Sequence, residues 1–234
     1  MRGDSLMALF RSLLAVLVLG VVLPGSVLAE TDQEAKMTEV IEVLEALNRI
    51  PERKIPPSLL ANAQGIAIIP SVVKVGFVFG GRYGRGVVCV RMPDGAWSNP
   101  VFISVTGGSV GWQIGAQSTD VILVFKSKKS VEGMIDGKFT LGADAAVAAG
   151  PIGRKASAST DAQLKAEIYS YSRSRGLFAG IALDGAALSI RTEDNTNYYE
   201  EFDLTAGRIF AGESKKTPAS AHRLRQLLDE YARP

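Results

Sequence analysis

Cysteine and histidine are almost absent from this sequence, because each occurs only once among 234 residues, as Cys89 and His222. A single thiol cannot form an internal disulfide, so the fold depends on a packed core for its stability. A single histidine leaves a catalytic triad or a metal cluster dependent on distant partners, and His222 is followed by Arg223 and Arg225 rather than by a carboxylate.

The other residues that could act as metal ligands or nucleophiles also lack a catalytic arrangement. The acidic side chains Asp120, Asp136 and Asp144 are not spaced as metal ligands, and each fits a turn. Cys89 alternates with valines in a strand pattern that is typical of an inert core thiol. We therefore predict no catalytic residue, no metal, no cofactor and no enzymatic activity.

The first 30 residues have the pattern of a secretory signal peptide. Arg2 and Arg11 precede an apolar run over residues 13–23, and Pro24 ends it. A membrane-spanning helix needs about 20 apolar residues, so the shortness of the run favours cleavage over anchoring. We expect cleavage after Ala29, export to the periplasm, and a single domain over residues 30–234.

An excess of charge of one sign is missing as well. Without residues 1–29 the chain keeps 24 basic and 23 acidic residues. A near-neutral chain is not drawn to nucleic acid or to an acidic surface by its overall field, so any electrostatic function must come from local patches. We expect no nucleic-acid partner.

Helices are expected at both ends of the domain. Residues 31–48 have Thr31 and Glu34 at capping-box spacing and apolar residues recurring on one face. That face is suited to a membrane surface too, but the glutamates opposite it favour packing on the protein core. The last helix begins with Thr217 as its cap and Pro218 as its first residue.

Between these helices the sequence has the texture of short strands. Six runs rich in β-branched and aromatic residues are separated by glycine, proline and Pro-Asp-Gly turns: GIAIIP, KVGFVFGG, GVVCVRM, NPVFISVTG, SVGWQIGAQ and DVILVFKS. A spacing of about ten residues leaves no room for crossover helices and favours antiparallel pairing. After a short surface helix over residues 128–137, AEIYSYSRS and GLFAGIALDGAALSIRTED continue the strand pattern.

Four glycines in residues 107–117 allow three interpretations: a membrane helix dimer face, a phosphate-binding loop, or glycines inside strands. The nearby Asp120 and the lack of about 20 continuous apolar residues exclude the first, and the absence of a following Gly-Lys-Ser/Thr excludes a Walker loop. Glycine in strands lets a sheet bend, so we predict that valine at Gly111 or Gly115 destabilises the domain. The predicted fold is an α+β domain with a strongly curved, mostly antiparallel, glycine-rich β-sheet, open or barrel-like, flanked by N- and C-terminal helices.

Five ordered motifs resemble the SYLF domain, a module of bacterial exported proteins and of eukaryotic actin-patch and phosphoinositide-binding proteins. They are IPPSLLANAQGIAIIP, VGFVFGGRYGRGV, DGAWSNPVFISV, GGSVGWQIGAQ with DVILVF, and YSRSRGLFAGIALDGAAL followed by NYY. The resemblance covers most of the chain after residue 29. It implies lipid binding, chiefly to phosphoinositides in eukaryotes, and a link to actin in fungi. The predicted export places this chain where actin is absent.

Basic residues form three local clusters near predicted strand ends, and a phosphate headgroup is bound well by such side chains. The clusters are Lys126, Lys128 and Lys129; Arg154 and Lys155; and Arg173 and Arg175. The alternative is an ordinary solvated surface. Trp97 and Trp112 fit either a pocket beside these charges or the core, and the core is favoured.

Two functions therefore remain open for this sequence. The first is a non-enzymatic lipid-binding module of the bacterial cell envelope that recognises anionic phospholipid headgroups at a membrane surface, through the three basic clusters. The second is a structural or protein-interaction protein of the periplasm that binds an envelope partner through an exposed sheet edge or helix.

Overall fold

The computed structural model of the chain describes residues 31–49, 55–135, 138–151, 166–174, 177–180, 183 and 185–233. Thr31–Pro234 is one compact unit. Its elements, in chain order, are α2 (Asp32–Asn48), α3 (Pro57–Ala61), β1 (Gly65–Val90), β2 (Val101–Phe125), α4 (Lys128–Ile135), β3 (Lys138–Thr140), β4 (Val147–Ala149), β5 (Ile168–Ser174), β6 (Leu177–Gly180), β7 (Ala187–Ile190), α6 (Thr192–Tyr199), α7 (Ala206–Phe210) and α8 (Ala219–Tyr231). Within these ranges no helix combines the length and the apolar character needed to cross a membrane.

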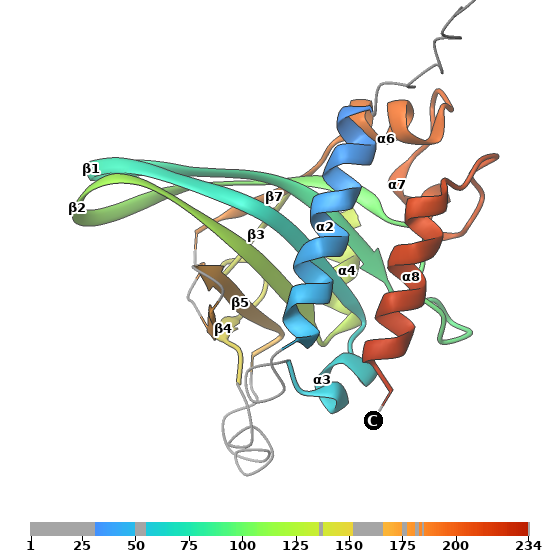
Figure 1. Ribbon diagram of the computed structural model, residues 1–234, viewed down its shortest axis with the longest axis horizontal. Coiled ribbons are helices and arrows are strands. Elements are labelled where there is room, and N and C mark those ends of the chain that lie inside the picture. Colours follow the sequence, from blue (N-terminus) through green and yellow to red (C-terminus); the bar gives the residue numbers. More distant parts are fainter. Residues whose placement is uncertain are drawn as a thin grey trace, which may run out of the picture. The chain divides into compact units, whose positions relative to one another are not determined.

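Both terminal helices form where the sequence predicts them, and they lie side by side (Figure 1). Thr31 caps α2, and its hydroxyl accepts a hydrogen bond from the backbone N–H of Glu34 at 3.2 Å. The apolar stripe of α2 is buried in the core, as expected. The predicted cap of α8 was wrong, because Pro218 is the N-cap and the hydroxyl of Thr217 lies 3.3 Å from the side-chain amide of Asn99 instead.

The central region differs from six short strands, because its runs join into two long strands. β1 and β2 pair antiparallel along almost their whole length, from Gly65 opposite Phe125 to Val88 opposite Val101. Together they form a long two-stranded ribbon. Glycine and proline do not end the strands here, since the cross-strand pairing continues past them.

These breaks in the sequence become bends in the ribbon. The register shifts between Ile69 and Val72, where Ser71 has a left-handed φ of 50°, and again between Gly76 and Val78. β1 has one extra residue at the first shift and β2 has two at the second, and such insertions bend and twist the pair. Gly107, Gly111 and Gly115 all lie within β2, so their assignment to a strand is confirmed.

The ribbon doubles back (Figure 1). The returning half of β1 passes its first half at a very short distance. A Cβ atom placed on Gly86 would lie 2.1 Å from the carbonyl oxygen of Ile68 and 2.6 Å from the Cα of Ile69. At Gly84 it would lie 2.8 Å from a methyl of Val72. Only glycine permits this approach of two backbones.

The other strands extend the ribbon into one strongly curled, seven-stranded half-barrel. The first part of β2 pairs with β7 on its outer edge, and β3 follows β7. The last part of β2 pairs with β5, which also pairs with β6 and β4. Only the β4–β5 pair is parallel among the pairs in the described strands, so the predicted α+β fold with a curved, mostly antiparallel sheet is confirmed.

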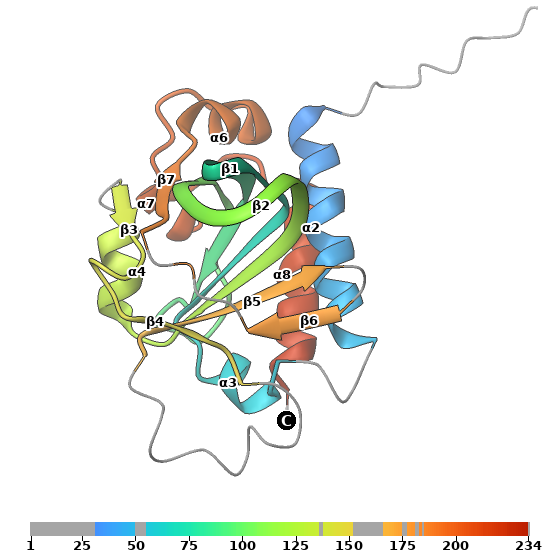
Figure 2. The ribbon, with the colours of Figure 1, turned by 90° about the vertical axis from the view of Figure 1, so that its left-hand side faces the viewer.

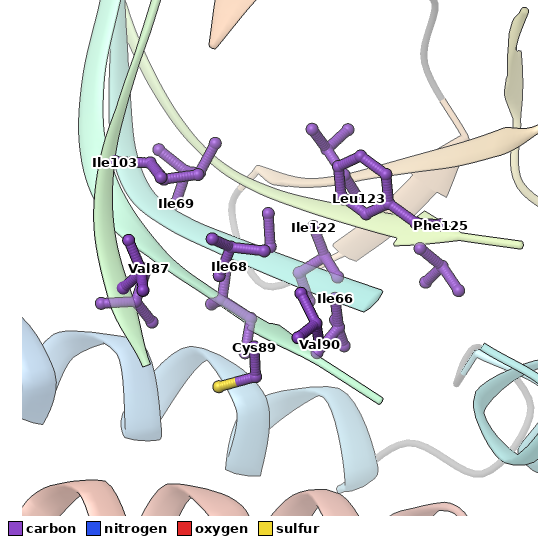
Figure 3. Packing of buried hydrophobic residues seen from close by; sticks show 14 of the residues in the cluster. Ile66, Ile68, Ile69, Val87, Cys89, Val90, Ile103, Ile122, Leu123 and Phe125 are labelled. Carbon is purple, nitrogen blue, oxygen red and sulfur yellow. The ribbon is translucent and has the colours of Figure 1, made fainter. Parts of the chain in front are cut away.

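The core lies between the curled sheet and the helices. Figure 3 shows side chains of both halves of the ribbon in contact, with the sulfur of Cys89 directed toward α2. Trp97 is 1% exposed, which confirms its core position, and the guanidinium of Arg91 lies 3.8 Å from the centroid of its ring. The side chain of Trp112 lies outside the described residues.

Candidate functional site

The first basic cluster lies where β2 ends and α4 begins. Lys128 and Lys129 open α4 and are exposed, while Lys126 is half-buried with its ammonium 5.6 Å from the centroid of the Tyr169 ring. The hydroxyl of Ser127 accepts a hydrogen bond from the backbone N–H of Ser130 at 3.1 Å, which is the geometry of a helix cap. The sequence therefore holds these lysines at a defined helix start.

The electrostatics of this helix start favour an anion. Free N–H groups at the first turn of a helix carry partial positive charge, and cations there are normally unfavourable. Lys128 and Lys129 add two full charges at that end of α4, and no carboxylate in the described part of the chain forms an ion pair with them. We call Lys126, Lys128 and Lys129 the α4 lysine cluster.

Arg173 has a structural partner in the same sheet. Its guanidinium lies 2.6 Å from the carboxylate of Asp120, and the other oxygen of that carboxylate accepts a hydrogen bond from the backbone N–H of Ser71 at 3.0 Å. Asp120 thus fixes the β1 bulge rather than a metal or a substrate.

The described basic clusters do not meet at one point. Arg173 pairs with Asp120 at one end of β5, whereas the backbone of Lys126 bonds to Glu167 at the other end. Six residues of strand separate these positions by roughly 20 Å, which is more than one headgroup spans. Arg154, Lys155 and Arg175 lie outside the described residues, so a headgroup site among all seven stays a prediction.

The described part of the chain provides no reactive group in a catalytic setting. Burial raises the pKa of the Cys89 thiol to about 12, so the thiol stays protonated at neutral pH. Burial also raises the pKa of Tyr199, whose hydroxyl donates to the carbonyl of Pro100 at 2.6 Å. His222 is exposed on α8, and no group of three acidic, cysteine or histidine side chains is placed to hold a metal among the residues described.

Asp144 and Asp136 are the other two aspartates that the sequence analysis assigned to turns. Asp144 accepts a hydrogen bond from the backbone N–H of Thr140 at 2.6 Å and so belongs to a turn, as expected. Asp136 lies outside the described residues.

A hollow of about 930 Å³ opens between the end of α4, β7, α6 and α7. Its lining residues are Ile135, Ser189, Ile190, Thr192, Asn195, Asp203, Leu204, Thr205, Ala206 and Gly207. Asn195 is 1% exposed, and its carbonyl oxygen accepts from the backbone N–H of Phe102 at 2.8 Å. Its amide nitrogen has no hydrogen-bond partner in the described part of the chain. Sequence reasoning missed this hollow because four separate elements build it.

Sequence reasoning also missed exposed apolar side chains on the ribbon. Val73 is 41% exposed, Val75 is 55% exposed and Tyr83 is 48% exposed, although all three belong to a strand of the central sheet. The sequence feature that could have pointed to this region is its lack of acidic residues, because Asp94 is the only acidic residue between Glu52 and Asp120.

Comparison with known proteins identifies relatives over most of the chain. The profile of the Ysc84 family, described as Las17-binding protein actin regulator, matches residues 106–231. SH3 domain-containing YSC84-like protein 1 of Xenopus laevis is 35% identical over 210 residues, which are 89% of this chain and 62% of that protein. Protein YSC84 of Saccharomyces cerevisiae is 37% identical over 210 residues, which are 88% of this chain and 44% of that protein.

The LAS seventeen-binding protein 3 of Saccharomyces cerevisiae is 36% identical over 202 residues, which are 84% of this chain and 43% of that protein. The chain thus spans about two fifths to three fifths of the length of these relatives. The similarity concerns the part of each relative that this chain covers.

Proposed function

The chain belongs to the Ysc84 family of SYLF-domain proteins, which is described as Las17-binding protein actin regulator. We propose that this chain is a non-enzymatic module that binds anionic phospholipid surfaces. The observation that carries the proposal is the α4 lysine cluster. Two of its three ammonium groups are exposed at the positive end of a helix. A lipid phosphate placed there gains charge-assisted hydrogen bonds from flexible lysines.

The near-neutral charge of the chain makes this binding local. Without residues 1–29 the 24 basic and 23 acidic residues leave a formal net charge of +1, which gives little long-range attraction to a membrane and is screened within about 8 Å at physiological ionic strength. Binding therefore depends on where the basic side chains lie and not on how many there are.

The proposed place of action is the cell envelope of a bacterium. Residues 1–29 have the pattern of a signal peptide, with cleavage after Ala29, and lie outside the described residues. Export places the domain beside the periplasmic face of a membrane, where phosphatidylglycerol and cardiolipin are the anionic lipids that we propose as partners.

A protein partner is the second candidate, and two observations favour it. Relatives are named Las17-binding proteins, so the family includes protein-binding members. The hollow beside α6 presents the unpaired amide of Asn195, and Phe202 is 85% exposed two residues before Leu204 of its lining. An unpaired buried donor with an exposed aromatic nearby suits a polypeptide that supplies a carbonyl and an apolar side chain.

Vesicle co-sedimentation tests the lipid proposal. The domain is mixed with vesicles of phosphatidylcholine alone and of phosphatidylcholine with 30% phosphatidylglycerol, a mole fraction of roughly physiological size. The double variant Lys128→Gln and Lys129→Gln is compared with the matched double variant Lys215→Gln and Lys216→Gln. Both remove two adjacent exposed charges, so they change the net charge equally. They differ in that Lys215 and Lys216 form ion pairs with Glu201 and Glu200.

We expect the α4 variant to lose about 25-fold in apparent affinity for the anionic vesicles, at about fivefold for each lysine, and the control to bind like the parent. Charge-removal variants of Arg154 with Lys155, and of Arg173 with Arg175, map the other two clusters. Equal losses in the α4 variant and the control would show that the net charge of the protein, and not the α4 lysine cluster, attracts it to the vesicles. If the parent binds no anionic vesicle, the protein-interaction function takes the place of lipid binding.

A further inference from the structure

The middle of the β1–β2 ribbon is uncovered on both of its faces. Successive residues of a strand point to opposite faces, yet Val73, Lys74 and Val75 are all exposed. On the paired strand Gln117 and Ser118, opposite Lys74 and Val73, are exposed too. This part of the ribbon is therefore covered neither by a helix nor by the rest of the sheet.

The pictures agree with these exposures. In Figure 1 the bend of β1 and β2 extends to the left, away from α2, α6 and α8. In Figure 2 the same bend points toward the viewer. Along this bend the outer edge of β2 has no paired strand in the described part of the chain, because β7 pairs with it only as far as Thr106 and β5 only from Asp120. We call residues 72–85 of β1 and 104–118 of β2 the ribbon tip. At its base Val72, Ser104 and Val105 are buried, and residues 104–106 still pair with β7.

The ribbon tip is basic as well as apolar. Its sequence contains Lys74, Arg82 and Arg85 and no acidic residue. None of the three forms an ion pair with a described carboxylate, and the Nε atom of Arg82 is buried without a hydrogen-bond partner in the described part of the chain. The body of the domain differs, because its arginines Arg173 and Arg191 are paired with carboxylates.

We propose that the ribbon tip docks on an anionic lipid bilayer, with Val73, Val75 and Tyr83 in the boundary between headgroups and acyl chains and its three cations on lipid phosphates. This inference rests on the proposed lipid-binding function and assigns it an apolar contact surface in addition to the α4 lysine cluster. Two features favour a bilayer over a protein partner. A protein covers one face of a ribbon, whereas a fluid interface surrounds both, and an acid-free basic tip complements a surface of phosphates.

The backbone limits how deep the ribbon tip enters. Its unpaired outer edge carries N–H and C=O groups that need hydrogen-bond partners, and the hydrocarbon core of a bilayer provides none. Water and headgroups satisfy these groups only in the interfacial region. The geometry therefore requires shallow insertion, with the backbone at the level of the headgroups.

A fluorescent label tests this placement directly. An environment-sensitive fluorophore is attached through the substitution Val75→Cys, and a control label through Phe202→Cys in the turn between α6 and α7. Cys89 is 1% exposed and does not compete for the label. With vesicles containing phosphatidylglycerol, we expect the emission of the label at position 75 to shift to the blue and to be quenched more by lipids brominated near the headgroup than near the chain end. The label at position 202 does not respond.

Affinity measurements with unlabelled variants complete the test. The variant Val73→Ser with Val75→Ser is expected to bind anionic vesicles about tenfold more weakly, since apolar burial is lost. The variant Lys74→Gln with Arg85→Gln is expected to lose about 25-fold, at about fivefold for each charge. Phe202→Ser, which removes an exposed aromatic elsewhere, binds like the parent. All substituted side chains of the tip are at least partly exposed, and thermal melts verify that each variant folds.

The outcomes separate the two proposals. If the parent binds anionic vesicles but the tip variants bind equally well and the label at position 75 does not shift, the ribbon tip is not the contact surface and lipid binding stands. If the parent binds no anionic vesicle, lipid binding itself is overturned, and the ribbon inference with it. A blue shift in concentrated protein without vesicles would show that a second copy of the chain covers the tip, which also overturns the inference.

Discussion

Replacing Gly86 by alanine tests whether the close crossing within β1 holds the domain together. The added Cβ atom would lie 2.1 Å from the carbonyl oxygen of Ile68 and 2.6 Å from the Cα of Ile69. Both atoms belong to the backbone, so a rotamer change cannot relieve the collision. To reach an ordinary contact of 3.4 Å, the two halves of β1 must separate by about 1.3 Å at this point.

The cost follows from what the two halves bury between them. Ile68 and Ile69 are at most 1% exposed, and their contacts with the returning strand weaken when the strands separate. A radial gap of about 0.5–1 Å forfeits a quarter to a half of the dispersion energy of each contact. Overpacking usually costs about 1–3 kcal/mol, and we expect the upper end, about 3 kcal/mol, because only backbone can move.

Thermal unfolding followed by circular dichroism measures this cost. For a domain of about 200 residues each kcal/mol lowers Tm by roughly 2–4 °C, so Gly86→Ala is expected to lower Tm by roughly 6–12 °C. Gly108→Ala is the matched control, because it lies in the paired strand and its added Cβ meets nothing within 4 Å. The control is expected to change stability by less than about 1 kcal/mol. If the two variants melt within about 2 °C of each other, the crossing is not as tight as described.

Three further outcomes are expected. Asp120→Asn removes the charge that holds Arg173 at 2.6 Å and should lower the free energy of unfolding in urea by about 1–3 kcal/mol; an unchanged midpoint would show that the pair contributes nothing. Tyr199→Phe leaves the buried carbonyl of Pro100 without its donor at 2.6 Å and should cost about 1–2 kcal/mol by the same measurement, while a neutral result would mean that water replaces the hydroxyl. Burial raises the pKa of the Cys89 thiol from 9.0 to about 12, so the unfolded chain releases this proton first and the thiol lowers stability as pH rises from 9 to 12. Cys89→Ala should remove that part of the pH dependence, and equal slopes in the two proteins would contradict the assignment.

Local patterns were sufficient to predict the two terminal helices and α4, whereas α7 was not predicted and the start of α6 was assigned to a strand. The Thr31 and Glu34 spacing defines the start of α2, and the apolar periodicity defines the buried face of both terminal helices. These features depend on residues three or four positions apart. The cap of α8 was missed because Thr217 bonds to Asn99, a residue 118 positions away.

The ribbon was not predictable in the same way. The sequence marks residues 70–73 as a break and Gly76 as part of a strand, but a break that ends a strand and a bulge that bends it have the same local composition. The choice is made by the pairing of β1 with β2, which aligns residues up to 60 positions apart, such as Gly65 and Phe125. Curvature was predicted from the glycines in strands, whereas the continuity of the two strands was not.

The features of the candidate site also divide into those that depend on neighbouring residues and those that depend on residues far apart in the sequence. The α4 lysine cluster is contiguous in the sequence and was therefore found. The pairing of Arg173 with Asp120 spans 53 positions and changes the meaning of that arginine, since its charge now fixes the sheet. The exposure of Val73 and Val75 is invisible in a pattern that reads as an ordinary strand.

The glycines of β1 link the fold to the proposed function. Because Gly84 and Gly86 let the returning strand cross the first one closely, both ends of the ribbon are packed in the core while its middle projects from it. The crossing thus supplies the stability that an isolated two-stranded ribbon lacks in water. It holds Val75 and Lys74 beyond the helices, at a point where apolar contact and phosphate binding can occur together. A chain with bulkier residues at the crossing would lose stability and the projecting ribbon tip through the same displacement.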